Sequence, residues 1–320
     1  MIFSIYQLSL IILSLFILIV SADQLVSQAD AIAKKFNFSQ VLVGLTVVAF
    51  GTSAPELMVS LSAALFETPP ASDAILGNVI GSNIANLLLV LGFAGLMHKI
   101  HLQGIDQKTN LYLFIVTAYF ILILSIYSQL TWVHTFIFFV ILLFFINHLK
   151  NFSTEQGESE NSIETDVSII KLLLSFLGFF IGGKLFLSES LVFFSNLGMA
   201  HTVIGLTILA LGTSLPELIT LIVAALKKKA AMGIGNVIGS NIMNILFVLF
   251  PSIIIVKARG YNFSSLNVET NDLLLLALST ATIIILILSN RSLNRILSLV
   301  FVLSYLIYIC LLYTSPSPRD

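Results

Sequence analysis

The sequence predicts an all-α polytopic membrane protein with ten transmembrane helices arranged as two inverted five-helix repeats. Three observations lead to this fold class: the composition, the number of long apolar runs, and a duplicated pair of motifs. Of the 320 residues, 58% are hydrophobic and 10% are charged, whereas a soluble domain carries about 25% charged residues. The formal net charge of -1 argues against nucleic acid as a partner. The single cysteine, Cys310, excludes an internal disulfide framework.

The apolar runs set the number of spans. A membrane-spanning helix needs about 20 apolar residues. We expect spans over residues 2–21, 41–65, 75–97, 111–128, 132–149, 169–194, 202–226, 232–256, 272–289 and 293–313. The first run lacks the basic start and small-residue cleavage site of a signal peptide, so we predict that it is retained as a helix. We therefore expect the chain to lie in a lipid bilayer. We also expect it to function as a monomer without a cofactor.

The second half of the chain repeats the motifs of the first half. "AFGTSAPEL" at 49–57 recurs as "ALGTSLPEL" at 210–218. "GNVIGSNIANLLLVLG" at 77–92 recurs as "GNVIGSNIMNILFVLF" at 235–250, with 12 of 16 positions identical. Because each half has an odd number of spans, the second half must cross the membrane upside down. The expected parts are a first repeat, a cytoplasmic linker, a second repeat, and a disordered or non-native tail, at residues 1–149, 150–168, 169–313 and 314–320.

Basic residues concentrate in cytoplasmic loops, and their distribution predicts the orientation. With the N-terminus outside, three basic residues fall outside, namely Lys257, Arg259 and Arg319. Eleven fall inside: Lys34, Lys35, Lys99, Lys108, Lys150, Lys171, Lys227, Lys228, Lys229, Arg291 and Arg295. We therefore expect an integral protein of the prokaryotic cell (inner) membrane with both termini outside. An inverted repeat with interrupted helices is typical of a secondary transporter whose site lies near the membrane midplane.

The first motif combines a helix breaker with a carboxylate. Proline removes one N–H and displaces the carbonyl four residues earlier, so Pro55 and Pro216 should loosen their helices and free carbonyls near Ala49 and Ala210. An unsatisfied carbonyl in lipid is costly unless something binds it. Residues three and four positions apart share a helix face. Hydroxyl and carboxylate groups therefore line one face in each repeat: Thr52, Ser53 and Glu56, and Thr213, Ser214 and Glu217.

The second motif places a polar stripe on each neighbouring helix. The stripes, spaced by four residues, are Asn78, Ser82 and Asn86, and Asn236, Ser240 and Asn244. All these donors are oxygen donors, which suits hard cations such as Na⁺ and Ca²⁺ and does not suit zinc or copper. The G-x-x-x-G spacing within the same stretches indicates close helix packing. Ionisable groups at membrane depth are functional by default, so the two glutamates favour a binding site over a purely structural role.

At these motifs the sequence resembles the sodium/calcium exchanger family of cation/calcium antiporters. The resemblance covers nearly the whole chain and implies two inverted five-helix repeats, four central ion sites, and exchange of about three Na⁺ for one Ca²⁺. It also implies alternating access by sliding of the first and sixth helices. By the same resemblance, Glu56 and Glu217 supply carboxylates, and Asn86 and Asn244 fill the paired positions between the repeats. Hydroxyl oxygens come from Thr52, Ser53, Thr213, Ser214, Ser82 and Ser240, and backbone carbonyls from Ala49, Ala210, Gly81 and Gly239.

One position departs from part of that family. Many microbial members and the potassium-dependent branch carry an aspartate where this chain has Asn244. With asparagine at both 86 and 244, the cluster holds two fixed negative charges, which one Ca²⁺ neutralises. An additional K⁺ would meet no carboxylate, so we expect transport that does not depend on K⁺.

Other functions remain as alternatives. A Ca²⁺/H⁺ antiporter is the first, because desolvation favours the protonated form of a buried carboxylate, so protons could compete for Glu56 and Glu217. The hydroxyl-rich G-T-S stretches favour sodium instead. An intramembrane serine protease would need a histidine or lysine base among the central helices, and an aspartyl type would need paired membrane aspartates. The sequence offers neither, so we do not expect an enzyme. A passive channel is a further alternative, which the interrupted, inverted helices disfavour.

Overall fold

The computed structural model describes residues 2–97, 100–102, 104–156, 166–196, 201–264 and 268–314. Side chains at 2–5, 153–156, 201–211 and 312–314 lie outside this description. The predicted tail from 315 to 320 and the middle of the predicted linker, 157–165, also lie outside the described residues.

The first half of the chain forms a series of helices interrupted by short π-helical segments. In order, its elements are α1 (Ile2–Lys35), α2 (Gln40–Val43), the π-helix η1 (Gly44–Val48), α3 (Ala49–Thr52), α4 (Ala54–Leu65), α5 (Ser72–Ala85), the π-helix η2 (Asn86–Val90), α6 (Leu91–Met97), β1 (Ile100–His101), α7 (Gln107–Ile126), β2 (Gln129–Leu130) and α8 (Trp132–Gln156).

The second half repeats the pattern after the linker. Its elements are α9 (Ile169–Asn196), α10 (His201–Leu226), α11 (Ala230–Met243), the π-helix η3 (Asn244–Leu249), α12 (Phe250–Ala258), β3 (Phe263–Ser264), α13 (Thr270–Leu288), β4 (Ser292–Leu293) and α14 (Arg295–Thr314).

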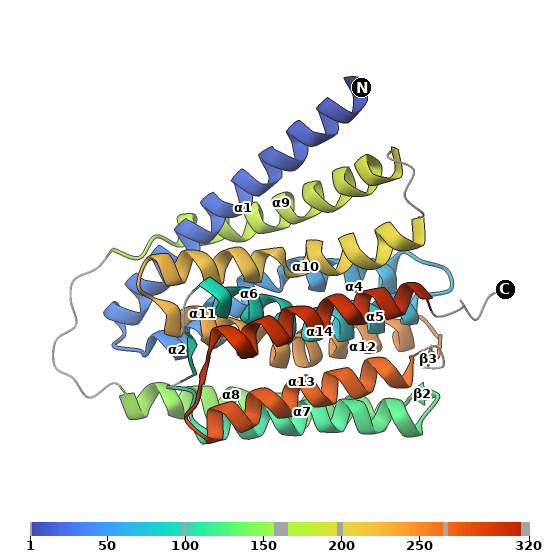
Figure 1. The fold of residues 1–320 in the computed structure, drawn as a ribbon. Coiled ribbons are helices and arrows are strands. Elements are labelled where there is room, and N and C mark those ends of the chain that lie inside the picture. The colour runs from blue at the N-terminus through green and yellow to red at the C-terminus, as the bar shows by residue number, and fades with distance from the viewer. Residues whose placement is uncertain are drawn as a thin grey trace.

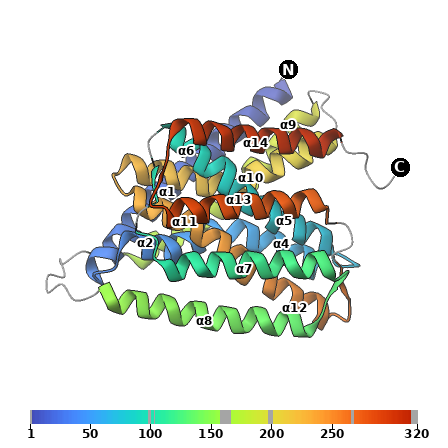
Figure 2. The same ribbon diagram turned by 60° about the horizontal axis from the view of Figure 1, so that its bottom comes forward.

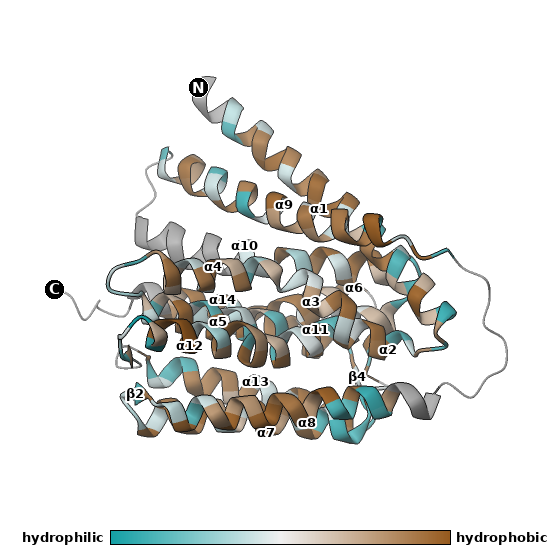
Figure 3. Cartoon of the chain, turned by 180° about the vertical axis from the view of Figure 1, so that it is seen from behind, coloured by the Kyte–Doolittle hydropathy of each residue, from teal (hydrophilic) through white to brown (hydrophobic). Residues whose placement is uncertain are grey.

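The described helices match the ten predicted spans. Seven are long and apolar enough to cross a bilayer by length and composition, and a bent pair, Gln40–Thr52 with Ala54–Leu65, supplies an eighth. Two shorter apolar helices, Gly212–Leu226 and Arg295–Leu311, occupy the remaining predicted positions. Hydrophobic residues run along the helices while hydrophilic residues gather at the two ends of the bundle (Figure 3). Exposed side chains such as Phe16, Phe136 and Phe144 are therefore placed for contact with lipid.

Two predicted boundaries were wrong. The first helix was expected to end near residue 21 but continues to Lys35, because its second half buries Ala22, Leu25, Val26 and Ala29 against the bundle. The fifth span continues to Gln156, so the first residues of the predicted linker are helical.

The helices form layers in which the motif helices are central. Figures 1 and 2 show α1 and α9 side by side on one face and α7 and α8 on the opposite face. Between these layers lie α4 and α5 from the first repeat and α10 and α11 from the second. The duplicated motifs are therefore brought together in the middle of the bundle, away from its lipid-facing surface.

Two small antiparallel sheets join loops of the two halves. β1 pairs with β4, with Ile100 opposite Leu293, and β2 pairs with β3, with Leu130 opposite Phe263. Figure 3 shows β2 and β4 at opposite ends of the bundle. The loops that carry β1 and β3 occupy equivalent positions in the two repeats, as do those that carry β2 and β4. Inversion of one repeat relative to the other places equivalent loops at opposite ends, and this is the arrangement observed.

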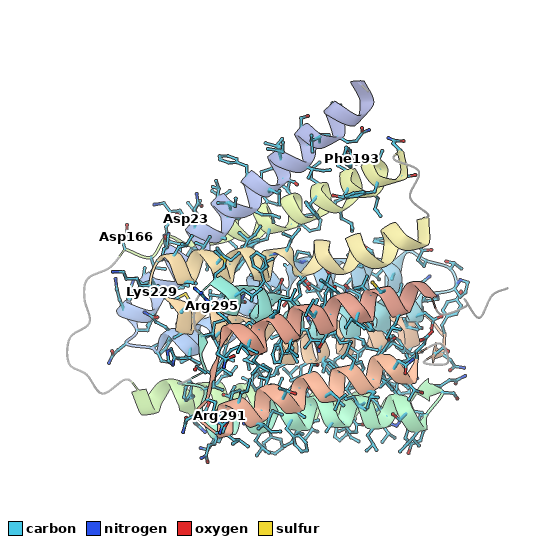
Figure 4. The ribbon with its side chains drawn as sticks, in the orientation of Figure 1. Asp23, Asp166, Phe193, Lys229, Arg291 and Arg295 are labelled. Carbon is cyan, nitrogen blue, oxygen red and sulfur yellow. The ribbon has the colours of Figure 1, made fainter. Side chains whose placement is uncertain are left out.

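The charged residues distinguish the two ends of the bundle. Figure 4 shows Lys229, Arg291 and Arg295 at one end, together with Asp23 and Asp166, and Phe193 at the other. We call the first the basic end and the second the far end. The N-terminal end of α1 and the C-terminal end of α14 both point toward the far end (Figure 1), as an even number of spans requires.

Glycine lets the two repeats pack backbone against backbone at the basic end. A Cβ on Gly44 would lie 2.2 Å from the Met232 carbonyl oxygen, and one on Gly235 would lie 2.5 Å from the Val41 carbonyl oxygen. Both contacts join α2 and η1 to α11. This packing confirms the close approach expected at Gly235, whereas the same expectation was wrong for Gly77 and Gly81, where an added Cβ would meet nothing within 4 Å.

Gly44→Ala is therefore expected to destabilise the protein by about 1–3 kcal/mol, because neither backbone can move away from the added methyl group. The measurement is the thermal unfolding midpoint in detergent, which should fall by several degrees. Gly183→Ala is the matched control, since its Cβ would meet Pro55 at an ordinary 3.7 Å. Equal midpoints for the two variants would contradict the close packing.

Candidate cation-binding site

The Thr-Ser-x-Pro-Glu stretch breaks the second span at its middle. α3 ends at Thr52, and the chain bends by 45° before α4 begins. Pro55 lies in the first turn of α4, where its missing N–H leaves no helical hydrogen bond unmade. This break directs Glu56 into the bundle from the first turn of a new helix.

The equivalent stretch of the second repeat does not break. α10 continues from His201 to Leu226 with Pro216 inside it, so the expectation of equal interruption in both repeats was wrong. The two copies differ in backbone shape despite nearly identical motifs. Neighbouring packing, which the local sequence does not encode, decides whether the proline ends the helix.

The two motif carboxylates are completely buried. Glu56 and Glu217 each have 0% of their surface exposed. Both carboxylate oxygens of Glu56, and Oε2 of Glu217, have no hydrogen-bond partner among the described residues. The two motifs meet at these carboxylates, because Ser53, three residues before Glu56, donates a hydrogen bond to Glu217. Ionised carboxylates buried in this way are strongly destabilising unless a cation or proton compensates them.

Hydroxyl and amide groups connect the first motif to the second repeat. Thr52 Oγ1 donates to Asn236 Oδ1 at 2.9 Å and lies 3.4 Å from Ser240 Oγ. Ser53 Oγ donates to Glu217 Oε1 at 3.4 Å. The break in the second span therefore places two hydroxyls against α10 and α11, although it also removes the continuous helix on which the shared face with Glu56 was predicted.

Within the first repeat, Asn78 fixes α5 to α4. Its Nδ2 donates to the Glu56 carbonyl at 3.0 Å and to Ser60 Oγ at 2.9 Å. Ser82 Oγ donates to the Asn78 carbonyl one turn earlier. Asn78 thus holds the backbone that carries Glu56, while its own Oδ1 has no partner among the described residues.

The paired asparagines each begin a π-helical segment. Asn86 is the first residue of η2 and Asn244 the first of η3, and both are fully buried. π-helical turns are frequent at functional sites. Neither side-chain polar atom of Asn86 has a partner among the described residues, and the same holds for Oδ1 of Asn244.

A third asparagine, Asn83, orients Asn244 across the repeats. Asn244 Nδ2 donates to Asn83 Oδ1 at 3.0 Å, and Asn83 Nδ2 donates to the Asn241 carbonyl at 3.2 Å. The second bond fixes which way the Asn83 amide points, so Asn244 directs its nitrogen to Asn83 and leaves its oxygen free. Sequence reasoning missed Asn83, although its place in the duplicated G-S-N triplet was an available signal.

The remaining predicted residues have mixed surroundings. Ser214, Thr213, Ala49, Gly239 and Ser240 are buried, whereas Gly81 is half-buried. The Ala49 carbonyl was expected to be freed, but it accepts a hydrogen bond from the Ser53 N–H at 3.0 Å and another from Thr52 Oγ1 at 3.4 Å. Ala210 lies in α10, where its side chain falls outside the described residues.

A cavity leads from the far end to the edge of this cluster. Its volume is about 410 Å³, and its walls come from α4, α5, α9 and α10. Glu67 and Lys184 line it, and Pro55 and Thr213 lie where it meets the motif residues. The cavity therefore reaches the edge of the cluster from the far end, while Glu56 and Glu217 stay fully buried behind it.

The chemistry of the cluster is that of a hard-cation site. Its donors are carboxylate, hydroxyl, amide and carbonyl oxygens, which Na⁺ and Ca²⁺ prefer. Among the described residues, no group of three or more histidine, cysteine, aspartate or glutamate side chains forms a conventional metal centre. The carboxylate and amide oxygens that have no partner in the described part of the chain make the fit to a cation good.

The comparisons with known proteins agree with this geometry. Residues 6–149 and 167–314 match the family model described as sodium/calcium exchanger protein. CaxA of Alkalimonas amylolytica is 32% identical over 322 residues, which cover 95% of this chain and 98% of CaxA. The sodium/calcium exchanger MaX1 of Methanosarcina acetivorans is 31% identical over 286 residues, covering 75% of this chain and 80% of MaX1.

The fold matches a solved transporter. A structure of the sodium-calcium exchanger NCX_Mj, soaked with Na⁺ and without Ca²⁺, aligns with a TM-score of 0.77 and 27% identity, covering 96% of this chain and 99% of that one. Other NCX_Mj crystals were soaked with Ca²⁺ or Sr²⁺. The ten-helix inverted-repeat fold is thereby confirmed. The chain is an integral membrane antiporter, not an enzyme, and it belongs to the sodium/calcium exchanger family.

Proposed function

We propose that this protein exchanges Na⁺ for Ca²⁺ across the membrane by alternating access, with the ions bound at the cluster around Glu56 and Glu217. One observation carries the proposal: two fully buried carboxylates, one from each repeat, whose oxygens are largely without partners among the described residues. Two such charges match one Ca²⁺, and the surrounding hydroxyls suit Na⁺ when Ca²⁺ leaves.

Each predicted group has a part in this proposal. Glu56 and Glu217 hold Ca²⁺, and Asn244, oriented by Asn83, offers its free amide oxygen beside Asn86. Side-chain and backbone oxygens complete the Ca²⁺ and Na⁺ sites; they come from Thr52, Ser53, Ser82, Thr213, Ser214, Ser240, Gly81, Ala210 and Gly239.

The experiment is uptake of radioactive Ca²⁺ by proteoliposomes under an imposed Na⁺ gradient, repeated with a proton gradient at constant Na⁺. We expect uptake driven by Na⁺ and little response to protons. Uptake driven only by the proton gradient would support the second candidate, a Ca²⁺/H⁺ antiporter. The buried carboxylates are consistent with that candidate, because a proton can neutralise their negative charge as a cation does.

We place the basic end in the cytoplasm and both termini outside, in a prokaryotic cell membrane. Support comes from the clustering of Lys229, Arg291 and Arg295 at one end (Figure 4). We also assign residues 1–149 and 169–313 to the two repeats, 150–168 to a linker and 314–320 to a tail, with one chain as the transporting unit.

Cysteine labelling tests this orientation. In a Cys310→Ser background, Phe66→Cys should react with a membrane-impermeant thiol reagent added outside, and Lys228→Cys with the same reagent added inside. Phe66 is 79% exposed and Lys228 is also exposed, so both positions can be reached. Reaction of both from the same side would contradict the orientation.

A further inference from the structure

The two ends of the ion pathway differ in this conformation. At the far end, the cavity of about 410 Å³ lies open between α9 and the motif helices. At the basic end, α2 and η1 pack directly against the backbone of α11. The hollowed end in this conformation is therefore the far end, and the alternating access of the proposed function requires a second conformation in which the far end is closed.

An ion pair fastens α1 to the motif helices at the basic end. Lys227 Nζ, just beyond α10, lies 2.6 Å from Asp23 Oδ1 on α1. The same nitrogen donates to the Asp23 carbonyl at 3.0 Å and to Ser27 Oγ at 2.7 Å. Three contacts from one side chain thus connect the end of a motif helix to the outer helix layer.

The internal repeat places a lysine at the far-end position equivalent to Asp23, and a glutamate one residue beyond the position equivalent to Lys227. Lys184 on α9 follows Asp23 by 161 positions, the offset that also relates Glu56 to Glu217. By the same offset, Lys227 and Lys228 correspond to Phe66 and Glu67, just beyond α4. Both Lys184 and Glu67 line the cavity, and no ion pair between them forms in the described part of the chain.

We propose that Lys184 and Glu67 form an ion pair that closes the far end in the second conformation, in which the pair between Asp23 and Lys227 is broken. The two pairs are alternatives, so each holds one end of the pathway shut. Lys184 and Glu67 thereby become gating residues of the transport cycle, distinct from the residues that bind ions.

The packing explains why one pair must open when the other closes. α1 and α9 are held together tightly: a Cβ on Gly178 would lie 2.0 Å from Ser21 Oγ, and one on Gly182 would lie 2.9 Å from Leu18 Cγ. Asp23 and Lys184 therefore sit on one rigid pair of helices. A tilt of that pair toward α4 at the far end separates it from α10 at the basic end.

Glu67 belongs to the part against which this pair moves. Arg259, after α12, donates through Nη1 to the Glu67 carbonyl at 3.0 Å and also to the Ala64 carbonyl. These bonds hold the end of α4 to the central bundle. Glu67 therefore stays in place, and its carboxylate can accept a hydrogen bond from Lys184 when Lys184 moves toward it.

A second basic-end contact has no far-end counterpart. Lys229 Nζ lies 2.5 Å from Asp30 Oδ1, but the equivalent positions are Thr68 and Leu191, which carry no charge. Opening the basic end must therefore break a second ion pair that has no equivalent at the far end. This difference favours the far-end-open conformation when no ion is bound.

The test measures cavity access directly, without ion flux, so its result does not depend on which ions are carried. Ser62, an exposed residue of the cavity wall, is replaced by cysteine in a Cys310→Ser background. The purified protein is labelled with a water-soluble thiol reagent in the absence of Na⁺ and Ca²⁺. Asp23→Asn should slow labelling about two- to fivefold, the range that a partly exposed ion pair provides. Adding Lys184→Gln to that variant should restore the original rate.

Charge exchange separates the pair from a general effect of charge. In the Asp23→Asn protein, Lys184→Glu together with Glu67→Lys should slow labelling again, since the pair is rebuilt in reverse. Glu189→Gln on α9 and Lys228→Gln at the basic end are the matched controls and should leave the rate unchanged. A rate that Asp23→Asn does not alter, or that Lys184→Gln does not restore, would overturn the proposal.

Cross-linking gives an independent result if a charge variant fails to fold. Lys184→Cys and Glu67→Cys are combined in the Cys310→Ser background and treated with a reducible bifunctional thiol reagent, because two long side chains can pair across a Cα–Cα distance that a direct disulfide cannot span. We expect a cross-link that stops transport and is reversed by a reducing agent. No cross-link in a protein that otherwise transports would show that the two residues never meet.

Discussion

Glutamine at position 56 or 217 is expected to abolish Ca²⁺ transport while leaving the protein folded. Both carboxylates are completely buried, so a bound Ca²⁺ has little water to compensate a missing charge. Removing one partner of a buried charge interaction costs about 3–5 kcal/mol, and about 1.4 kcal/mol is a factor of ten. The Na⁺-driven Ca²⁺ flux of Glu56→Gln or Glu217→Gln should therefore fall by about 100-fold or more.

Folding should survive these substitutions, because a neutral amide is easier to bury than a carboxylate. The unfolding midpoint of the ion-free protein should stay the same or rise. Glu189→Gln, an acid-to-amide change on α9 away from the site, is the control for flux and folding. Near-normal flux in either Glu56→Gln or Glu217→Gln would contradict the assignment of the two carboxylates to the ion site.

Aspartate at position 244 is expected to give an exchanger that weakens as the pH rises. Asn244 donates to Asn83 Oδ1 at 3.0 Å. A protonated aspartate can make this bond through its O–H, whereas an ionised one would place a negative oxygen against the Asn83 oxygen. Asn83 cannot turn its amide without losing its bond to the Asn241 carbonyl. The ionised form would also bring a third negative charge close to the two glutamates.

The measurement is the ratio of Asn244→Asp flux to wild-type flux across about pH 6 to 9. The ratio should be near one at low pH, where the aspartate is protonated, and fall several-fold at high pH.

Replacing K⁺ by choline should leave wild-type flux unchanged, because two carboxylates leave no charge for an added K⁺. A wild-type protein that stops without K⁺, or a variant that gains rate at high pH, would contradict this charge count.

The sequence predicted the spans and the inversion well because both depend on features that can be read from the chain itself, without knowledge of its tertiary contacts. Apolar run length gave helix positions, and the odd number of spans in each half gave the inversion. The duplicated motif also predicted that Glu56 and Glu217 belong to one site, because the two copies of a motif in an inverted repeat meet near the middle of the bundle. The contacts of Thr52 and Ser53 with the second repeat lay beyond what the spacing within one motif predicted.

The sequence could not predict features that depend on contacts between the repeats. Pro55 lies at the start of a new helix, yet Pro216 lies inside an unbroken one, and the two motifs differ too little to distinguish these outcomes. Asn83 gains its role only because Asn241 and Asn244 of the other repeat lie next to it. The length of α1 depends on the bundle that covers Leu25 and Val26, which hydropathy alone does not show.

The position of the bound ion tests the central claim most directly. Crystals of the protein soaked with Sr²⁺ as a heavier substitute for Ca²⁺ would reveal the ion by anomalous scattering. A peak is expected in contact with the carboxylates of both Glu56 and Glu217, and it should be absent when excess Na⁺ is added. A well-occupied peak elsewhere, with both glutamates free of it, would contradict the proposed site.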